Sequence, residues 1–118
     1  MRLGRIVLYV RDVEATIRFY EEHFGYVAER VDGDRITELV APDDGVNLMI
    51  HQAGKAQKMG QVLVKLVFDV SDVEAFCLES RAKGLEFGSI HQADGYQYAN
   101  AKDPNGNSIS VSSRGFRI

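Results

Sequence analysis

The sequence predicts an α+β fold built from two tandem βαβββ modules, and two observations support this prediction. The hexapeptide "VRDVEA" at 10–15 returns as "VSDVEA" at 70–75, sixty residues later in a chain of 118. The same order of apolar segments and turns surrounds both copies. A common helix start explains four matching letters, but it does not explain a recurring order of elements. Duplication is therefore the better interpretation.

The first half predicts a strand, a helix and three further strands. Segment 5–10, "RIVLYV", is apolar and β-branched, as strands prefer. Asp12 is a good helix N-cap, and apolar residues at helical spacing continue as far as Gly25, a typical C-terminal glycine. The turns "DGD" and "APDDG" divide the rest of this half. Strands are then expected at 26–31, 35–40 and 46–51.

The second half repeats this order. Segment 65–70, "KLVFDV", matches the first strand position for position, Asp72 caps a second helix, and Gly84 ends it. The last turn, "DPNGN", corresponds to "DDGVN" of the first half. Strands are expected at 85–91, 96–102 and 107–112.

The chain length fits one domain over 1–118. Within it we assign the first module to 1–53, a polar link to 54–61 and the second module to 62–118.

Composition excludes several classes of partner. A formal charge of −3 argues against nucleic acid, which requires a basic surface. No apolar run is long enough to cross a bilayer, and the first twelve residues lack the apolar core of a signal peptide. With Cys77 as the single cysteine, a reducing cytoplasm is the expected location.

The segments "YVRDVEATIRFYEEHFGY" (9–26) and "AKDPNGNSISV" (101–111) resemble the vicinal oxygen chelate superfamily, which includes glyoxalase I, bleomycin-resistance proteins and extradiol dioxygenases. The matched positions are Asp12, Phe19, Tyr20, Phe24 and Gly25 in the helix, and Asp103, Pro104, Gly106 and Asn107 in the turn. The resemblance implies two curved mixed sheets that form a ligand-binding cup, and a homodimer. It leaves the activity open, because this superfamily includes lyases, dioxygenases, epimerases and binding proteins.

Strand alternation, combined with this fold, assigns residues to the cup. The candidate ligand-binding residues are Arg5, Tyr9, Asn47, Met49, His51, Lys65, Asp69 and Ser110. Arg5 and Lys65 hold equivalent positions, and a pair of cations suits a small anionic or carbonyl ligand. Two alternatives stay open: both charges reach solvent at the mouth of the cup, or Asp69 pairs with one of them.

The resemblance also locates the positions that hold metal ligands in metal-dependent members. They fall on Arg5, Lys65 and Ser110, with the fourth on Asn47 or Met49. Guanidinium has no lone pair to donate, ammonium must first lose a proton, and serine supplies no charge. We therefore expect no metal and no other cofactor. A replacement site built from His51 and His91, with Glu38 as a third ligand, stays an alternative.

Three functions remain open from the sequence. The first is metal-independent binding of a small molecule, as in the bleomycin-resistance branch. The second is an enzyme, namely a lyase, isomerase or dioxygenase with a non-standard metal or with acid/base groups such as His51, Tyr9 and Asp69. The third is a degenerate module for protein association. No nucleophile arrangement is apparent, so the catalytic residues of any enzyme stay unassigned. Tyr96 and Tyr98 are either walls of the pocket or part of an interface, and aromatic residues on a strand more often serve packing than ligand binding.

Overall fold

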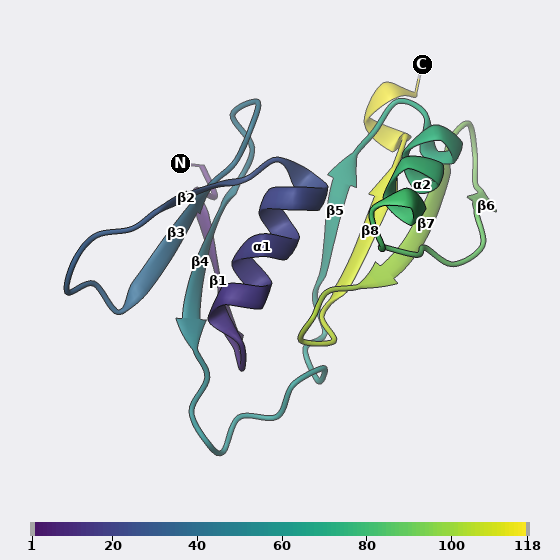
Figure 1. Cartoon of the computed structure of the whole chain (residues 1–118). Coiled ribbons are helices and arrows are strands. Elements are labelled where there is room, and N and C mark those ends of the chain that lie inside the picture. Colours follow the sequence, from purple (N-terminus) through teal and green to yellow (C-terminus); the bar gives the residue numbers. More distant parts are fainter. Residues whose placement is uncertain (1, 118) are drawn as a thin grey trace. The chain divides into compact units, whose positions relative to one another are not determined.

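The computed structural model describes residues 2–117, which divide between Met59 and Gly60 into two compact units (Figure 1). The first unit contains β1 (Arg5–Val10), α1 (Val13–Phe24), β2 (Val27–Glu29), β3 (Ile36–Val40) and β4 (Asn47–Gln52). The second contains β5 (Lys65–Asp69), α2 (Val73–Ala82), β6 (His91–Gln92), β7 (Gln97–Lys102), β8 (Ser108–Ser112) and a short 3₁₀ helix, η1 (Arg114–Phe116). The predicted α+β class and the repeated βαβββ order are confirmed.

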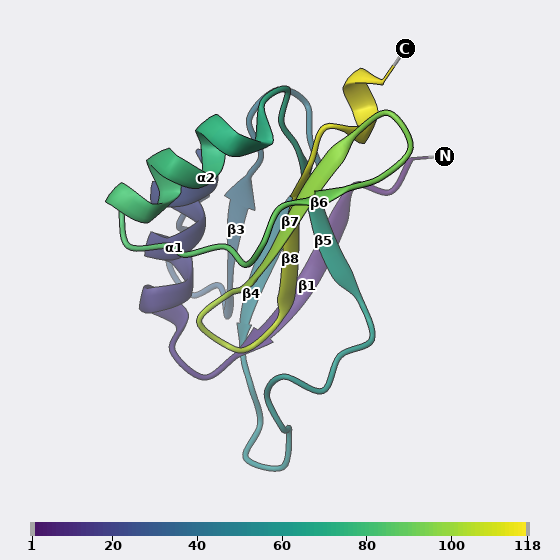
Figure 2. The same ribbon diagram turned by 90° about the vertical axis from the view of Figure 1, so that its right-hand side faces the viewer.

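Both sheets are mixed and share one topology. The strand order is β1-β4-β3-β2 in the first unit and β5-β8-β7-β6 in the second. β1 pairs with β4 in parallel, and so does β5 with β8, whereas all other neighbours are antiparallel. Figure 2 shows α2 along one face of its own sheet.

The repeated hexapeptides are helix starts, as expected. An Asp12 carboxylate oxygen accepts a hydrogen bond from the Ala15 amide at 3.0 Å, and Asp72 does the same for Ala75 at 3.0 Å. Each cap thereby satisfies one of the amide groups that the first turn leaves without a partner inside the helix. Gly25 ends α1 in the left-handed region, at φ 72°.

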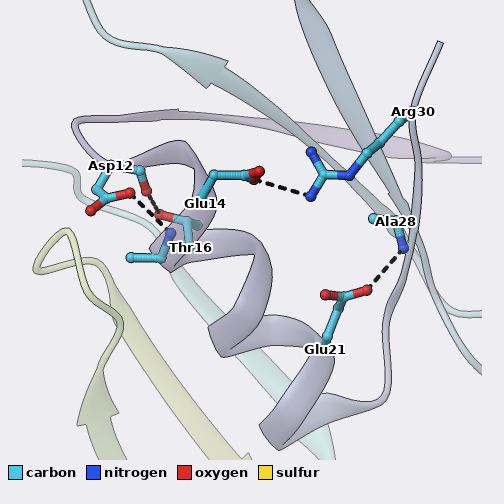
Figure 3. Close-up of polar contacts among 7 residues, drawn as sticks. Asp12, Glu14, Thr16, Glu21, Ala28 and Arg30 are labelled. Carbon is cyan, nitrogen blue, oxygen red and sulfur yellow. Dashed lines mark hydrogen bonds and ion pairs between the residues drawn. The ribbon is translucent and has the colours of Figure 1, made fainter.

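Two side chains of α1 tie the helix to the strand that comes after it (Figure 3). Glu14 forms an ion pair with Arg30 at 3.0 Å, and Glu21 accepts a hydrogen bond from the Ala28 amide at 3.4 Å. Both sides of the Glu14–Arg30 pair are largely exposed, so this pair contributes little to stability.

The core of each unit lies between its helix and its sheet. In the first unit Ile17 and Tyr20 of α1 are buried together with alternate strand residues such as Leu8 and Val10. The intervening Tyr9 is 48% exposed, so β1 has one buried and one open face. In the second unit Val73, Ala99, Ile109 and Val111 are buried, and Ser110 and Ser112, which alternate with the apolar residues of β8, are buried as well.

Two predicted strands are shorter than expected, and the first of them, expected at 26–31, is a strand only at Val27–Glu29. The segment expected at 85–91 pairs as a strand only at His91 and Gln92. Leu85 and Phe87 are buried, so apolar residues alternate along this segment although its backbone is not continuously hydrogen-bonded to a neighbouring strand. The helix η1 was not expected from the sequence. Within residues 2–117 no helix has the length and apolar character required to span a membrane.

Candidate functional site

The first sheet has a face that α1 does not cover, and it carries five of the candidate residues. This first face consists of Arg5, Val7 and Tyr9 from β1, Asn47, Met49 and His51 from β4, and Glu38 from β3. In the parallel register Arg5 lies opposite Asn47, and Tyr9 lies opposite His51. At the usual strand rise, the four-residue separation of Arg5 and Tyr9 spans about 13 Å.

A shared carboxylate organises the polar end of the first face. One oxygen of Glu38 accepts a hydrogen bond from Arg5 Nε at 3.1 Å, and the other accepts one from Asn47 Nδ2 at 2.8 Å. Asn47 is held in turn, because its side-chain oxygen accepts from the Ala41 amide at 2.9 Å. The hydrogen bond from Arg5, and after it that from Asn47, lowers the pKa of Glu38 and so favours its charged form.

This arrangement fixes the direction of the Arg5 side chain without using all of its donors. Glu38 engages the Nε edge of the guanidinium. Among residues 2–117, no group accepts a hydrogen bond from either Nη atom of Arg5. The Arg5 side chain is 56% exposed. Its Nη edge can therefore receive a carboxylate or carbonyl oxygen from solution.

The other end of the first face is aromatic and apolar. The rings of Tyr9 and His51 lie 5.3 Å apart at 48°. Between them and Arg5 lie Val7, which is 40% exposed, and the half-buried Met49. His51 Nδ1 lies 2.9 Å from the carbonyl oxygen of Gln52, so this nitrogen is the donor, and in the neutral ring Nε2 is then the acceptor.

The open face of the second sheet carries the remaining candidates, Lys65, Asp69 and Ser110. Lys65 Nζ donates a hydrogen bond to the side-chain oxygen of Asn100 at 3.0 Å. Ser110 is buried and donates to the carbonyl of Ala99 at 3.0 Å, so its hydroxyl is already engaged. Asp69 is exposed and takes part in no ion pair among the described residues. The carboxylate that pairs with a candidate cation is Glu38.

The strand registers resolve which positions of the two units are equivalent. Met49 lies opposite Val7, as Ser110 lies opposite Val67, so Met49 is the counterpart of Ser110. The two alternatives left by the sequence are thereby reduced to one. By the same reasoning Glu38 corresponds to Asn100, because these residues pair with Met49 and Ser110.

The residues at the superfamily's metal positions do not fit a metal ion. In the first unit they are Arg5, a permanent cation bound to Glu38, and Met49, whose thioether is a soft and uncharged donor. In the second unit they are Lys65, whose ammonium is a donor to Asn100, and the buried Ser110. The described residues also contain no group of three His, Cys, Asp or Glu side chains placed to hold an ion.

A separate hollow of about 300 Å³ lies beside α2, and no candidate residue of the open sheet faces lines it. Its walls include Leu78, Phe87 and Ile90, and Cys77 also lines it. Burial raises the pKa of Cys77, which keeps the thiol protonated and unreactive near neutral pH.

Comparison with protein-family models gives one match over nearly the whole chain. Residues 2–111 match the model described as Glyoxalase/Bleomycin resistance protein/Dioxygenase superfamily. A search of curated proteins found no match.

Solved structures with similar folds carry several different names. An antibiotic binding protein from Streptomyces sp. CB03234 superposes with a TM-score of 0.77 at 19% identity, covering 94% of this chain and 93% of its own. A superfamily member from Sphaerobacter thermophilus gives 0.76 at 15% identity, covering 95% and 96%. A lactoylglutathione lyase from Agrobacterium tumefaciens gives 0.71 at 17% identity, covering 94% and 92%. These similarities establish the fold, and their names cover both binding and catalysis.

Proposed function

Because the chain belongs to the Glyoxalase/Bleomycin resistance protein/Dioxygenase superfamily, we propose that it binds a small organic molecule without a metal ion. The ligand carries a carboxylate or carbonyl group at one end and an apolar or planar body at the other. The observation that carries this proposal is the orientation of Arg5. Its Nε edge is bound to Glu38, and its Nη edge is open beside an exposed aromatic and apolar surface.

The charge balance of the first face defines which polar group fits. Glu38 neutralises Arg5, so the site attracts an anion less strongly than a free guanidinium would. The remaining Nη donors still provide hydrogen bonds to a carbonyl or carboxylate oxygen, and bonds to a charged group contribute about 1.5–3 kcal/mol. A neutral carbonyl and a monocarboxylate are thus both suitable.

The apolar part of the first face supplies the rest of the binding energy. Val7 and Tyr9 are exposed, and Met49 and His51 extend the same surface. A ligand body that covers about 100 Å² of apolar surface here gains about 2.5 kcal/mol. The separation of Arg5 from Tyr9 matches a ligand of two fused rings with one polar substituent.

Metal independence is supported by the chemistry of the inherited positions. Arg5 and Lys65 are cations, and Ser110 is buried with its hydroxyl engaged. The structurally similar antibiotic binding protein is a precedent for binding in this fold. At 19% identity its name does not transfer to this chain, and it supports the proposal only as a precedent.

Three probes of equal size test the proposal: 2-naphthoate, 2-acetylnaphthalene and 2-naphthylmethylamine. We expect the acid and the ketone to bind saturably in calorimetric titrations, and the amine to bind more weakly. EDTA should change nothing, and Arg5→Gln should weaken acid binding about tenfold, equivalent to the loss of a charge-assisted hydrogen bond. Arg18→Gln, at an exposed position of α1, is the matched control. Full affinity in Arg5→Gln, or loss of binding in EDTA, would overturn the proposal.

A second candidate function, acid/base catalysis, is favoured by His51. The hydrogen bond between Nδ1 and the Gln52 carbonyl selects, in the neutral ring, the tautomer in which Nε2 is the acceptor on the first face. An enzyme of this kind would exchange the α-protons of 2-acetylnaphthalene with deuterium from solvent. Exchange that His51→Gln abolishes, with binding unchanged, would favour catalysis over simple binding. The same exchange rate with and without protein would exclude it for this probe.

We also propose that the protein is a homodimer, as the superfamily resemblance implies. Val62, Leu63 and Val64 form an exposed apolar run just before β5, and such runs are rare on monomers. Light scattering on the purified protein tests this directly. A monomeric mass at micromolar concentration would refute the dimer, and Leu63→Asp should shift a genuine dimer toward monomer.

A further inference from the structure

Two arginines of the second unit gather around one tyrosine at the end of the sheet. Tyr96 lies just before β7, and Arg114 and Arg117 come from η1 and the residue after it. Their Cζ atoms lie 5.3 Å and 5.4 Å from the centre of the Tyr96 ring. Figure 2 shows η1 beside the loop that joins β6 to β7. The two guanidinium carbons therefore lie within about 11 Å of each other.

Each guanidinium is held in place by uncharged groups. Arg114 Nη1 donates a hydrogen bond to the hydroxyl of Tyr96 at 3.1 Å. Arg117 Nη1 donates to the main-chain carbonyl of Asp94 at 3.2 Å. The stem of Arg117 also packs on Gly95, where an added Cβ would lie 3.2 Å from its Cδ. Glycine at position 95 therefore has two roles: it allows the positive φ of 79° in the turn, and it leaves space for the Arg117 side chain.

Neither arginine of this pair is bound directly to a carboxylate among residues 2–117. The ion pairs of the described residues join Arg5 to Glu38, Arg30 to Glu14 and Arg81 to Glu86, and neither Arg114 nor Arg117 takes part in one.

Two acidic residues lie close to the cluster. The carboxylate of Asp69 lies against Gly115, at 3.3 Å from where a Cβ would be, and Asp94 contributes its carbonyl. Both guanidinium groups lie against the Tyr96 ring, and an anion that contacts both would offset their mutual repulsion.

We propose that Arg114, Arg117 and Tyr96 form a binding site for the phosphate of a small phosphate monoester. A phosphate monoester carries a charge of about −1.5 to −2 at neutral pH, which matches two guanidinium groups. The Nε and Nη2 atoms of both arginines have no acceptor among residues 2–117, so each arginine retains the fork that binds phosphate oxygens.

Neighbouring rings offer a surface for the organic part of this ligand. Tyr98 lies 6.3 Å from Tyr96, and His91 stacks on Tyr98 at 5.0 Å and 30°. An aromatic group attached to the phosphate can pack against these rings, adding contact area to the charge match. The site lies entirely in the second unit, so it is separate from the first face and extends the proposed function.

A pair of probes that differ in charge tests the site. Phenyl phosphate is mainly a dianion at about pH 7.5, whereas benzenesulfonate is a monoanion of similar shape. We expect phenyl phosphate to shift the amide resonances of Gly95 and Gly115 saturably in NMR titrations, with at least about fivefold higher affinity than benzenesulfonate at constant ionic strength. Equal affinity for the two probes would overturn the claim that two cations act together.

Variants assign the binding to these residues. The double variant Arg114→Gln/Arg117→Gln should lose at least about tenfold in affinity for phenyl phosphate, whereas Arg18→Gln should lose none. Should the double variant not fold, Arg114→Lys/Arg117→Lys keeps both charges, loses both forks, and should give an intermediate affinity. Unchanged affinity in whichever of the two variants folds would refute the site.

The first face provides the control that separates the two proposals. Arg5→Gln should leave the response of the Gly95 and Gly115 amides to phenyl phosphate unchanged, because Arg5 belongs to the other unit. If Arg5→Gln abolishes this response while the Arg114/Arg117 variants do not, the phosphate binds elsewhere and this inference fails. Naphthoate binding can fail or succeed independently of either result.

Discussion

Replacing Glu38 by glutamine tests the polar network that organises the first face. Glutamine has nearly the same shape, but it offers one oxygen acceptor where glutamate offers two. The glutamine side chain therefore accepts the hydrogen bond from either Arg5 or Asn47 and loses the other. Its NH₂ group then faces the N–H group whose acceptor has been lost. The variant removes charge and one acceptor, and it leaves no cavity.

The expected cost depends on how exposed the partners are. The Arg5 side chain is 56% exposed and that of Glu38 is 24% exposed, so solvent screens this ion pair to about 0.5–1 kcal/mol. The hydrogen bond from Asn47 to a charged acceptor adds about 1 kcal/mol. Glu38→Gln should therefore lower the free energy of unfolding by about 1–2 kcal/mol and the melting temperature by roughly 4–8 °C.

The pH dependence of this cost gives a second, sharper readout. The pKa of Glu38 is lowered in the folded protein from its ordinary value of 4.5. Its stabilising contribution is thus complete above pH 4.5 and is lost as the pH falls through the lower folded value. The difference between the native protein and Glu38→Gln should shrink in urea titrations as the pH is lowered from neutral to acid.

Glu22→Gln is the matched control, because Glu22 is exposed on α1. It should change the free energy of unfolding by less than about 0.5 kcal/mol. A cost for Glu38→Gln no larger than that of the control, or a cost that does not depend on pH, would refute the assignment of Glu38 as the residue that holds Arg5.

Three further predictions concern the fold and the thiol. Asp12→Ala and Asp72→Ala each remove an N-cap and should each cost about 1 kcal/mol in urea unfolding, and a neutral result at either position would contradict the capping role. Gly25→Ala should cost about 1 kcal/mol or more in thermal unfolding, because φ is 72°, whereas Gly4→Ala meets open space and should be tolerated. Cys77 should react with a disulfide reagent far more slowly than free cysteine, because burial raises its pKa, and equal rates would show an accessible thiolate.

The sequence predicts both helices well because their signals are local. The Asp12 side chain reaches the amide three residues on, whatever the rest of the chain does, and the same geometry recurs at Asp72. Strand faces are also predictable, since the alternation along β1 places Leu8 and Val10 in the core and leaves Tyr9 open.

Pairing partners are harder to predict, and the segment before β6 illustrates why. Leu85 and Phe87 are buried at alternate positions, which is the pattern that predicts a strand. The Gly88 amide bonds to the Asn100 carbonyl, but regular pairing with β7 begins only at His91. Alternation records which side chains are buried, and it carries no information about where the neighbouring backbone lies.

The same limit applies to the candidate site. Arg5, Glu38 and Asn47 come from three strands, and their contact depends on the register of each pair. Strand alternation alone suggests Asp69 as the partner of a cation. Alternation shows which face of the sheet a residue lies on, but it does not show which residue of the neighbouring strand lies beside it. The position of Glu38 on β3 is the available signal, and it becomes interpretable only once β3 is aligned with β4.

The strand registers also show where the two halves of the chain have diverged in length. The offset between equivalent residues is sixty for Arg5 and Lys65, sixty-one for Met49 and Ser110, and sixty-two for Glu38 and Asn100. Insertions and deletions have thus accumulated in the loops while every strand kept its partner. Glu38 and Asn100 are therefore homologous positions with different chemistry, a charged anchor in one half and a neutral amide in the other. Exchanging Glu38 and Asn100 would give each half the polar group of the other and would leave the loop lengths of both halves unchanged.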